Sequence, residues 1–180
     1  MSMQGHVKML VMQTALKTKG RRTVVTGPIG SGKTTRVLQL VQTYRDAGCD
    51  VAGVVSLHLN ADDPELESYR FRFLSSGEEL SRWQRDQGYA RAAGNDTDVI
   101  VIDECGPLEL RGEGLWKELR RAWTAFPGEV VVTVRERLLD EFLNALDARG
   151  ATDGGRARDE GRAAASGGAV EVIRLPDRSV

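Results

Sequence analysis

Nine consecutive residues near the start of the chain have the composition and spacing of a loop that binds phosphate. The first eight of them match the Walker A pattern G-x-x-x-x-G-K-[ST] in full. Glycines permit backbone conformations in which successive N–H groups point inward, and the start of a helix adds a partial positive charge. The nine residues, called the phosphate loop below, therefore form a predicted cradle for nucleotide phosphates. They are Gly27, Pro28, Ile29, Gly30, Ser31, Gly32, Lys33, Thr34 and Thr35.

Three side chains at the end of the phosphate loop have separate expected roles. The ammonium group of Lys33 is placed to neutralise the β- and γ-phosphates of a nucleoside triphosphate. The Thr34 hydroxyl is a candidate ligand of Mg²⁺, which prefers hard oxygen atoms and keeps several waters. Thr35 is expected to donate to the α-phosphate. The plain alternative is a glycine-rich turn between a strand and a helix that binds nothing.

Two acidic residues follow an apolar run later in the chain, in a Walker B arrangement. Residues 99–102 are Val-Ile-Val-Ile, and Asp103 and Glu104 come next. We expect a parallel strand beside the strand that leads into the phosphate loop, because its carboxyl end then brings Asp103 to the ligand edge of the sheet. Asp103 is a candidate to hold a water of the Mg²⁺ shell, and Glu104 to orient or deprotonate an attacking water. The alternatives are a turn former at Asp103 and a solvent-facing or partner-binding acid at Glu104.

The elements that must position these residues alternate between strands and helices. Strands are predicted at 22–26, 51–57, 99–102, 130–134 and 170–175, and helices at 33–47, 77–93, 115–126 and 138–146. This alternation predicts an α/β fold with a mostly parallel sheet and helices on both faces. Tyr69, Phe71 and Phe73 alternate with Arg70 and Arg72, which predicts a half-buried antiparallel strand in an inserted β-hairpin.

The composition is that of an ordinary globular protein. The 180 residues are 41% hydrophobic and 28% charged, which predicts one domain over residues 21–180 after a leader at 1–20. No apolar run approaches the roughly 20 residues that a membrane span needs. Two cysteines without a metal-ligand pattern fit a reducing compartment, so we expect a cytoplasmic protein. Residues 148–168 are rich in Gly, Ala and Arg and are expected to form a loop.

The residues that follow the acidic pair, together with one later segment, narrow the choice among nucleotide-binding families. The run Asp103-Glu104-Cys105-Gly106-Pro107-Leu108-Glu109-Leu110, together with the phosphate loop, resembles the small THEP-type nucleoside-triphosphatases. Val132-Thr133-Val134-Arg135 resembles that family's next strand and the arginine after it. The resemblance covers about residues 23–146. It implies a three-layer, RecA-like P-loop core and slow Mg²⁺-dependent hydrolysis of nucleoside triphosphates to diphosphates, with broad base tolerance.

Several residues of these segments have two open interpretations. Arg135 is our first candidate for a catalytic arginine acting in cis on transition-state charge, and a salt bridge with a neighbouring acid is its alternative. Thr133 is expected at a strand end beside the acidic strand, as a γ-phosphate sensor or as a plain strand-end residue. Glu109 either bonds within the turn after the acidic strand or helps to place the nucleotide. Arg156, Arg158 and Arg162 are second candidates for a lid, and Cys105 is expected to be a small buried side chain.

Two other functions stay open at this point. The first is a nucleoside or small-molecule kinase, which would need an acceptor pocket and an acid near the second strand, where Asp62 and Asp63 are candidates. The second is a regulatory module in which the nucleotide controls contact with RNA or a protein partner. Eight basic residues precede the first acidic residue, Asp46, so the leader can attract polyanions. A solvated leader without a partner is the plainer interpretation.

Overall fold

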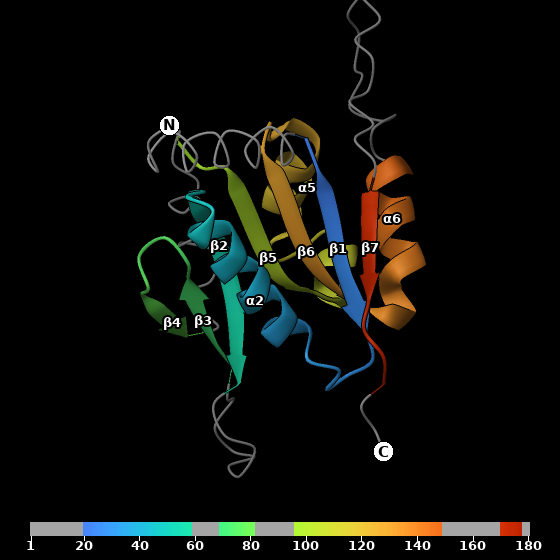
Figure 1. Ribbon diagram of the computed structural model, residues 1–180. Coiled ribbons are helices and arrows are strands. Elements are labelled where there is room, and N and C mark those ends of the chain that lie inside the picture. Colours follow the sequence, from blue (N-terminus) through green and yellow to red (C-terminus); the bar gives the residue numbers. More distant parts are fainter. Residues whose placement is uncertain (1–19, 59–68, 82–95, 149–169, 178–180) are drawn as a thin grey trace, which may run out of the picture.

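The computed structural model describes residues 20–58, 69–81, 96–148 and 170–177, which form one sheet with helices on both faces (Figure 1). The seven strands have the order β4-β3-β2-β5-β6-β1-β7. They are β1 (Arg22–Gly27), β2 (Val51–His58), β3 (Tyr69–Phe73), β4 (Glu79–Ser81), β5 (Val99–Cys105), β6 (Glu129–Arg135) and β7 (Val170–Arg174). The helices are α2 (Lys33–Asp46), α4 (Pro107–Leu110), α5 (Trp116–Ala125) and α6 (Leu139–Ala148), with a single 3₁₀ turn at Glu136–Leu138.

The sheet is parallel except at the β3–β4 edge. Strands β2, β5, β6, β1 and β7 pair in parallel, so their carboxyl ends meet at one edge of the sheet (Figure 1). Strands β3 and β4 form an antiparallel hairpin, and β3 pairs with β2. Phe71 and Phe73 are buried while Arg70 and Arg72 are exposed, as their alternation predicts. The predicted α/β class with a mostly parallel sheet is confirmed.

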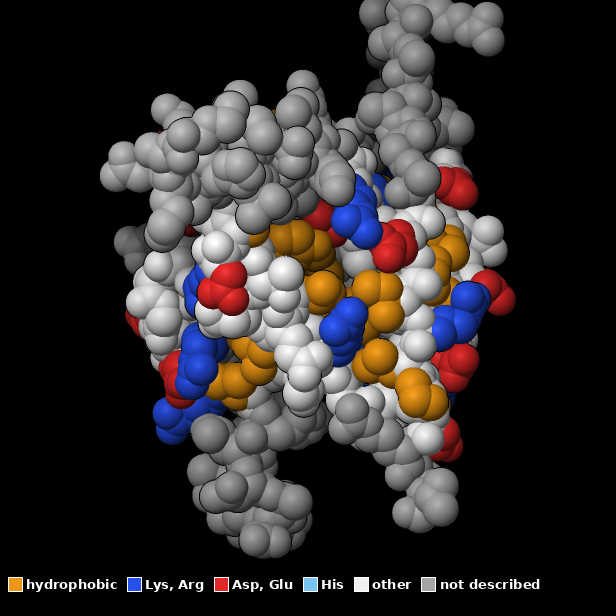
Figure 2. Space-filling view, viewed as in Figure 1, with side chains coloured by type: hydrophobic (Ala, Val, Ile, Leu, Met, Phe, Trp, Pro, Cys, Tyr) orange, Lys and Arg blue, Asp and Glu red, His pale blue; other side chains and the backbone are white. Residues whose placement is uncertain are grey.

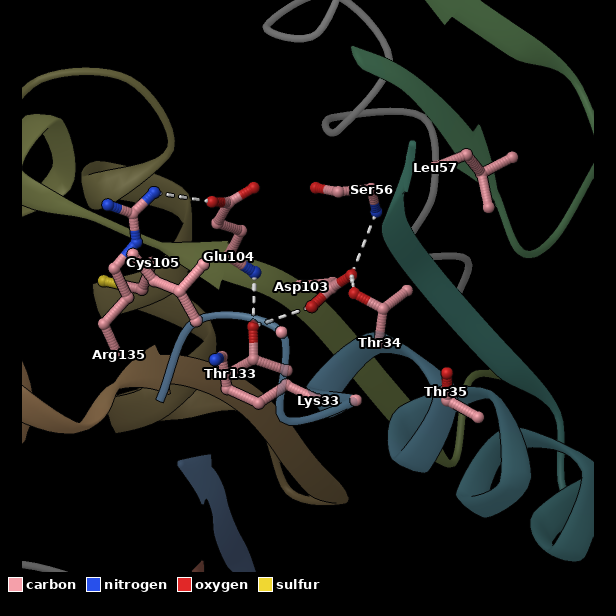
Figure 3. Close-up of a pocket in the computed structure, with 13 residues that line it drawn as sticks. Lys33, Thr34, Thr35, Ser56, Leu57, Asp103, Glu104, Cys105, Thr133 and Arg135 are labelled. Atoms are coloured by element: carbon pink, nitrogen blue, oxygen red, sulfur yellow. Dashed lines mark hydrogen bonds and ion pairs between the residues drawn. The ribbon is translucent and has the colours of Figure 1, made fainter. Parts of the chain in front are cut away.

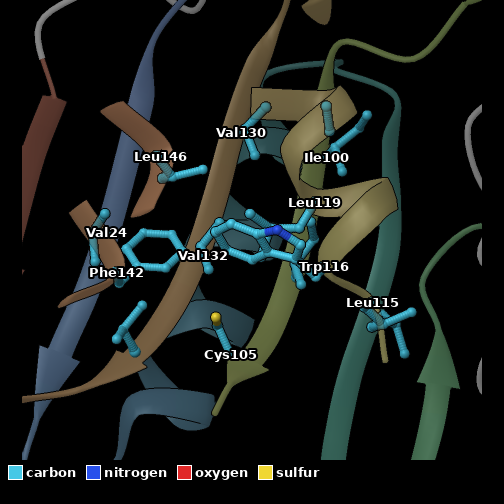
Figure 4. Packing of buried hydrophobic residues seen from close by; sticks show 14 of the residues in the cluster. Val24, Ile100, Cys105, Leu115, Trp116, Leu119, Val130, Val132, Phe142 and Leu146 are labelled. Carbon is cyan, nitrogen blue, oxygen red and sulfur yellow. The ribbon is translucent and has the colours of Figure 1, made fainter. Parts of the chain in front are cut away.

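Two hydrophobic clusters lie on opposite faces of the central strands and make three layers. Val25 packs in one cluster with Val37 and Val41 of α2. Its neighbour Val24 points to the other face, into the cluster that contains Leu119 and Phe142 of α5 and α6 (Figure 4). Since both faces are covered, the strands are nearly continuous apolar runs, and their polar residues occur where they end.

The strand order corrects one expectation about the site. Strand β5 does not lie beside β1, because β6 lies between them and pairs with both. Gly27 is therefore opposite Arg135 of β6, and Asp103 reaches the phosphate loop across the end of β6. The local pattern could not predict this order, since each of these strands is an apolar run of the same kind.

A second expectation was wrong in part. The helix predicted over 77–93 is contradicted at Glu79–Ser81, which pair with β3 as strand β4. Gly77 has a positive φ of 73° in the turn between these strands, so the glycine forms a hairpin turn where the pattern was taken for a helix start. The rest of that prediction, the leader and the 148–168 segment lie outside the described residues, except for Gly20 and Ala148. No described helix is long and apolar enough to cross a membrane.

A buried glycine sets the spacing of the two strands that carry the acidic side of the site. Gly53 of β2 has a φ of 124°. A Cβ atom built on it would lie 1.9 Å from the carbonyl oxygen of Val101 in β5. Any side chain at residue 53 would therefore separate β2 from β5, so glycine permits their close pairing.

At the amino ends of the parallel strands, Arg22 is expected to be the largest single polar contributor to fold stability. Its side chain is 6% exposed. Its guanidinium donates to the carbonyl oxygens of Trp123, Phe126, Gly128 and Arg21 at 2.6–2.9 Å. These bonds close the end of α5 and its connection to β6, where helix carbonyls lack helical partners.

We predict that Arg22→Met lowers the free energy of unfolding by about 3 kcal/mol, because it leaves buried carbonyl groups without donors. Urea denaturation followed by circular dichroism measures the change. Arg111→Met, at an exposed arginine, is the matched control and should be nearly neutral. A loss below about 1 kcal/mol for Arg22→Met, which is the typical net worth of one hydrogen bond, would contradict this account.

Candidate active site

A cavity of about 390 Å³ lies at the carboxyl edge of the sheet, between the phosphate loop and the ends of β2, β5 and β6 (Figure 3). Ligands bind at this edge in open α/β sheets. The cavity brings together most of the residues singled out from the sequence. Its lining residues are Ile29, Gly30, Gly32, Lys33, Thr34, Thr35, Ser56, Leu57, Asp103, Glu104, Cys105, Thr133 and Arg135.

The phosphate loop has the backbone shape that an anion cradle needs. Gly32 immediately precedes α2 with a φ of 87°, a conformation that disfavours any residue with a Cβ atom. The N-terminus of α2 therefore faces the loop with its free N–H groups. Ile29, at the tip of the loop, is 77% exposed. The predicted strand–loop–helix context is thus present.

Lys33 is held by the loop itself. Its Nζ donates to the carbonyl oxygens of Gly27 at 2.9 Å and Pro28 at 2.6 Å. Burial, and secondarily the nearby Arg135, lower the pKa of the Lys33 ammonium group. A phosphate oxygen is a stronger partner for this cation than a neutral carbonyl. Lys33 is therefore positioned to exchange carbonyl partners for a phosphate.

Asp103 is the centre of a hydrogen-bond network that joins three strands and α2 (Figure 3). Its Oδ2 accepts from the Thr34 hydroxyl at 2.9 Å and from the Ser56 N–H at 3.1 Å. Its Oδ1 accepts from the Thr133 hydroxyl at 2.7 Å. Asp103 is 2% exposed, and burial raises the pKa of its carboxyl group although these three donors oppose the rise. The network fixes the carboxylate against the phosphate loop.

Glu104 has an unusual backbone that turns it away from the regular strand. It is the single non-glycine residue with a positive φ, 73°, in the part of the chain that the structure describes. The pairing of β5 with β6 is irregular between Ile102 and Cys105, so Glu104 lies in a bulge. Its N–H donates to the Thr133 hydroxyl at 2.5 Å. Such a conformation costs about 1–2 kcal/mol and is typical of functional positions.

The carboxylate of Glu104 is paired with the candidate catalytic arginine. Arg135 Nη2 lies 3.0 Å from Glu104 Oε1, and both side chains are about one-third exposed at the cavity mouth (Figure 3). The structure therefore contains the salt bridge that was the alternative interpretation of Arg135. The same pair brings an acid and a cation to the place where a γ-phosphate would approach the loop.

The oxygen atoms of Thr34 and Asp103 are hard ligands of the kind that a magnesium ion takes. No group of three or more His, Cys, Asp or Glu side chains that could hold a metal occurs in the described ranges. Mg²⁺ does not need such a cage, because it takes one or two protein oxygens and completes its shell with water and phosphate. The buried Asp103 carboxylate, without a cationic side chain bonded to it among the described residues, suits that arrangement.

Comparisons with known proteins agree with this geometry. A model of a family described as NTPase matches residues 84–153, which include the acidic pair and Arg135. Nucleoside-triphosphatase THEP1 of Ignicoccus hospitalis is 29% identical over 138 residues, with 68% of this chain and 80% of that protein covered. THEP1 of Pyrococcus abyssi is 26% identical over 141 residues, with 67% and 78% covered. The chain is therefore similar to THEP-type nucleoside-triphosphatases, as its motifs indicate.

A solved structure has a similar fold. The solution structure of a human cancer-related nucleoside triphosphatase superposes with a TM-score of 0.53 and covers 86% of this chain and 88% of its own. The two sequences are 18% identical, so this likeness concerns the fold. The THEP-type resemblance of the motifs and the P-loop type of fold are therefore both confirmed.

The remaining candidate residues from the sequence have the following places in the structure. Glu109 is buried, and its Oε2 accepts from the Gly106 N–H at 3.0 Å, which is the bond within the turn rather than a nucleotide contact. Cys105 is buried as expected, at 1% exposure. Thr35 is exposed at the cavity rim. Arg156, Arg158 and Arg162 lie outside the described residues.

Ser56 and Leu57 are the cavity residues that sequence reasoning missed, and Ser56 is the polar one of the two. It lies near the end of β2, is 2% exposed and bonds Asp103 through its N–H. A serine near the end of an apolar strand has no distinctive pattern. Only the parallel pairing of β2 with β5, made close by Gly53, places it beside the acidic pair.

Asp103→Asn is expected to increase stability while it damages the site. Burial raises the pKa of Asp103, so above that pKa the folded protein holds an ionised group that would be better solvated after unfolding. The cost develops as the pH rises through the ordinary aspartate value of about 3.9 and is complete above the raised pKa. Asparagine does not ionise and avoids it.

Thermal unfolding of ligand-free protein at two pH values measures this effect. The melting temperature of Asp103→Asn should exceed that of the wild type at pH 7, and the difference should shrink near pH 4. Asp98→Asn, at a carboxylate that accepts an exposed hydrogen bond from the Asp50 N–H, is the control. A variant less stable than the wild type at pH 7 would show that the three hydrogen bonds outweigh the desolvation.

Proposed function

We propose that this chain is a Mg²⁺-dependent nucleoside-triphosphatase that hydrolyses the β–γ bond by attack of water. The observation that carries the proposal is one continuous set of hydrogen bonds. It runs from the Thr34 hydroxyl through Asp103 to Thr133, and from Thr133 to the N–H of Glu104. The metal-binding oxygens and the backbone of the candidate base are thereby joined in one hydrogen-bonded unit. The names of the THEP1 relatives support the same activity.

Binding begins at the phosphate loop. The free N–H groups at the start of α2 and the Lys33 ammonium group face the same end of the cavity. Lys33 leaves the carbonyls of Gly27 and Pro28 and bonds the β- and γ-phosphates. The exchange favours a triphosphate, because the negative charge of the γ-phosphate compensates best for the two hydrogen bonds that Lys33 loses to the carbonyl oxygens.

Thr34 and Asp103 would hold the metal side of the triphosphate. A bound Mg²⁺ supplies charge that stabilises the phosphate oxygens during transfer. The Thr34 hydroxyl bonds a carboxylate oxygen of Asp103, so the two possible ligands lie within one hydrogen bond of each other. Thr133 keeps the second oxygen of Asp103 occupied and so fixes the plane of the carboxylate.

Glu104 and Arg135 divide the chemistry at the γ-phosphate. Arg135 exchanges its Glu104 partner for the phosphate oxygens, on which negative charge develops. The freed Glu104 carboxylate accepts a proton from the attacking water. The water oxygen forms a bond to the γ-phosphorus while the bond to the bridging oxygen breaks, and the nucleoside diphosphate leaves. The ion pair thus represents the resting arrangement of both groups.

Broad base tolerance is part of the proposal. Apart from Ser56, the polar side chains that line the cavity are assigned to phosphate, metal or water chemistry. Discrimination among bases needs further buried polar groups. The kinase alternative has no specific support, because β2 ends in Ser56, Leu57 and His58 rather than in an acid. Asp62 and Asp63, its candidate residues, lie outside the described residues.

A regulatory module that binds RNA or a protein partner is likewise without specific support. The basic leader on which that prediction depends lies outside the described residues up to residue 19. On the face that α2 covers, the described basic and acidic side chains are interspersed rather than gathered into one basic patch (Figure 2). The leader and domain boundaries, the cytoplasmic location and an RNA or protein partner stay predictions.

Product analysis tests the proposed activity. Purified protein is incubated with ATP, GTP, CTP and UTP, with Mg²⁺ or with EDTA, and products are separated by thin-layer chromatography. We expect diphosphate and free phosphate from all four substrates, only with Mg²⁺. Phosphate that appears on an added nucleoside instead of in solution would establish a kinase. Absence of turnover with all four would overturn the proposal.

A further inference from the structure

We propose that the Ser56 hydroxyl is a second positioning group for the attacking water, opposite Glu104. The inference rests on the proposed function, since it assigns a residue to the water-attack step. It assigns a side chain whose sequence context does not suggest a role.

The Ser56 hydroxyl is a buried polar group without a hydrogen-bond partner in the described part of the chain. The residue is 2% exposed and lines the cavity. A buried hydroxyl without a partner costs about 1–3 kcal/mol. The cost is avoided when a bound water or ligand supplies the partner. An unpaired hydroxyl in the wall of a nucleotide cavity therefore indicates a group that is paired in the complex.

Two contacts fix the position of the Ser56 backbone beside Asp103. Its N–H donates to Asp103 Oδ2, the same oxygen that accepts from Thr34. The close pairing of β2 with β5 at Gly53 holds the strand in that register. Figure 3 shows the Ser56 hydroxyl pointing across Asp103 toward the side of the cavity where Glu104 projects. Ser56 and Glu104 thus approach the region above Asp103 from two sides.

Two groups on opposite sides can orient a water molecule. The Glu104 carboxylate accepts one proton of the water and is the group that finally takes it. The Ser56 hydroxyl accepts the other hydrogen, which directs an oxygen lone pair toward the γ-phosphorus. A single carboxylate leaves the water free to rotate about one hydrogen bond, and the second partner removes that freedom. Ser56 is a positioning residue in this scheme and takes no proton permanently.

Ser56→Ala separates this role from ground-state binding. We expect kcat for ATP to fall roughly tenfold to hundredfold with an unchanged KM, because the lost contact matters only when water attacks. Complexes with ADP and beryllium fluoride, which imitate the bound triphosphate, should form with wild-type affinity. Complexes with ADP and aluminium fluoride, which also imitate the planar phosphoryl group with its axial water, should weaken by a similar factor.

Thr26→Val is the matched control. Thr26 is also fully buried at a strand end, and its hydroxyl also lacks a partner among the described residues, but it does not line the cavity. This variant should keep wild-type kcat and wild-type complexes with both fluorides. Ligand-free Ser56→Ala should unfold at or above the wild-type temperature, since the removed hydroxyl has no bond to lose.

Three results would overturn the inference. The first is wild-type turnover and aluminium fluoride affinity in Ser56→Ala. The second is an equal loss of beryllium fluoride and aluminium fluoride binding, which would assign Ser56 to the phosphate or to the metal shell. The third is a large loss of folding stability. If the proposed function itself is wrong, the result is distinguishable, because the wild-type protein will then release no phosphate.

Discussion

Glu104→Gln is expected to bind nucleoside triphosphate as tightly as the wild type and to lose about 10²-fold or more of its turnover. Glutamine keeps the size and the hydrogen-bonding reach of the side chain but cannot accept the proton of the attacking water. Arg135 loses an ionic partner at the cavity mouth, where an exposed pair contributes about 0–1 kcal/mol, so the fold should be unaffected.

Single-turnover hydrolysis and equilibrium binding of a non-hydrolysable triphosphate, measured on the same preparation, check this expectation. Glu113→Gln is the matched control, because Glu113 is exposed, faces Arg111 and does not line the cavity. It should behave as the wild type in both assays. Unimpaired turnover in Glu104→Gln would move the activation of water to another group and would reopen the kinase interpretation.

Lys33→Ala is expected to fold normally and to lose about 10²-fold of its affinity for ATP. Hydrogen bonds to charged partners contribute about 1.5–3 kcal/mol, and Lys33 is assigned to two phosphates. The two loop carbonyls that Lys33 bonds in the ligand-free protein are partly open to water, so their loss costs little folding energy. The loss for ADP should be smaller than for ATP, since the γ-phosphate is absent.

Isothermal titration with ATP and ADP measures both affinities. Lys117→Ala removes an equal charge at an exposed position of α5, outside the cavity, and controls for the change in net charge. Wild-type affinity for ATP in Lys33→Ala would mean that residues 27–35 are not the phosphate site. Equal losses for ATP and ADP would instead assign Lys33 to the β-phosphate alone.

The phosphate loop, the acidic pair and the layer order could be predicted from sequence because each has a local pattern. Glycines at fixed spacing before a lysine specify a backbone shape, and an apolar run followed by two acids specifies a buried strand that ends at the ligand edge. The local structure of these residues is determined by the residues next to them in the sequence. Thr133 does lie beside the acidic strand as expected, but its segment is identified through its resemblance to the THEP-type sequences rather than through a local pattern.

The parts that could not be predicted depend on pairing between distant segments. The insertion of β6 between β1 and β5 is decided by packing, since all three strands have similar apolar sequences. Strand β4 is short, and its two polar residues in three resemble a loop or helix surface. Ser56 and Arg22 have roles that exist only after β2 meets β5 and after α5 folds back on β1. The pairing of Glu104 with Arg135 likewise requires the β5 bulge.

The left-handed backbone of Glu104 also bears on how this protein can evolve. A change from a glutamate codon to a glycine codon needs one nucleotide substitution, and glycine adopts a φ of 73° without cost. The same mutation that removes the proposed base would therefore relieve backbone strain and stabilise the fold. Selection for stability alone then favours the loss of catalysis in a duplicated gene. Such copies would still have the phosphate loop, so nucleotide-binding proteins without turnover are one mutational step away from this chain.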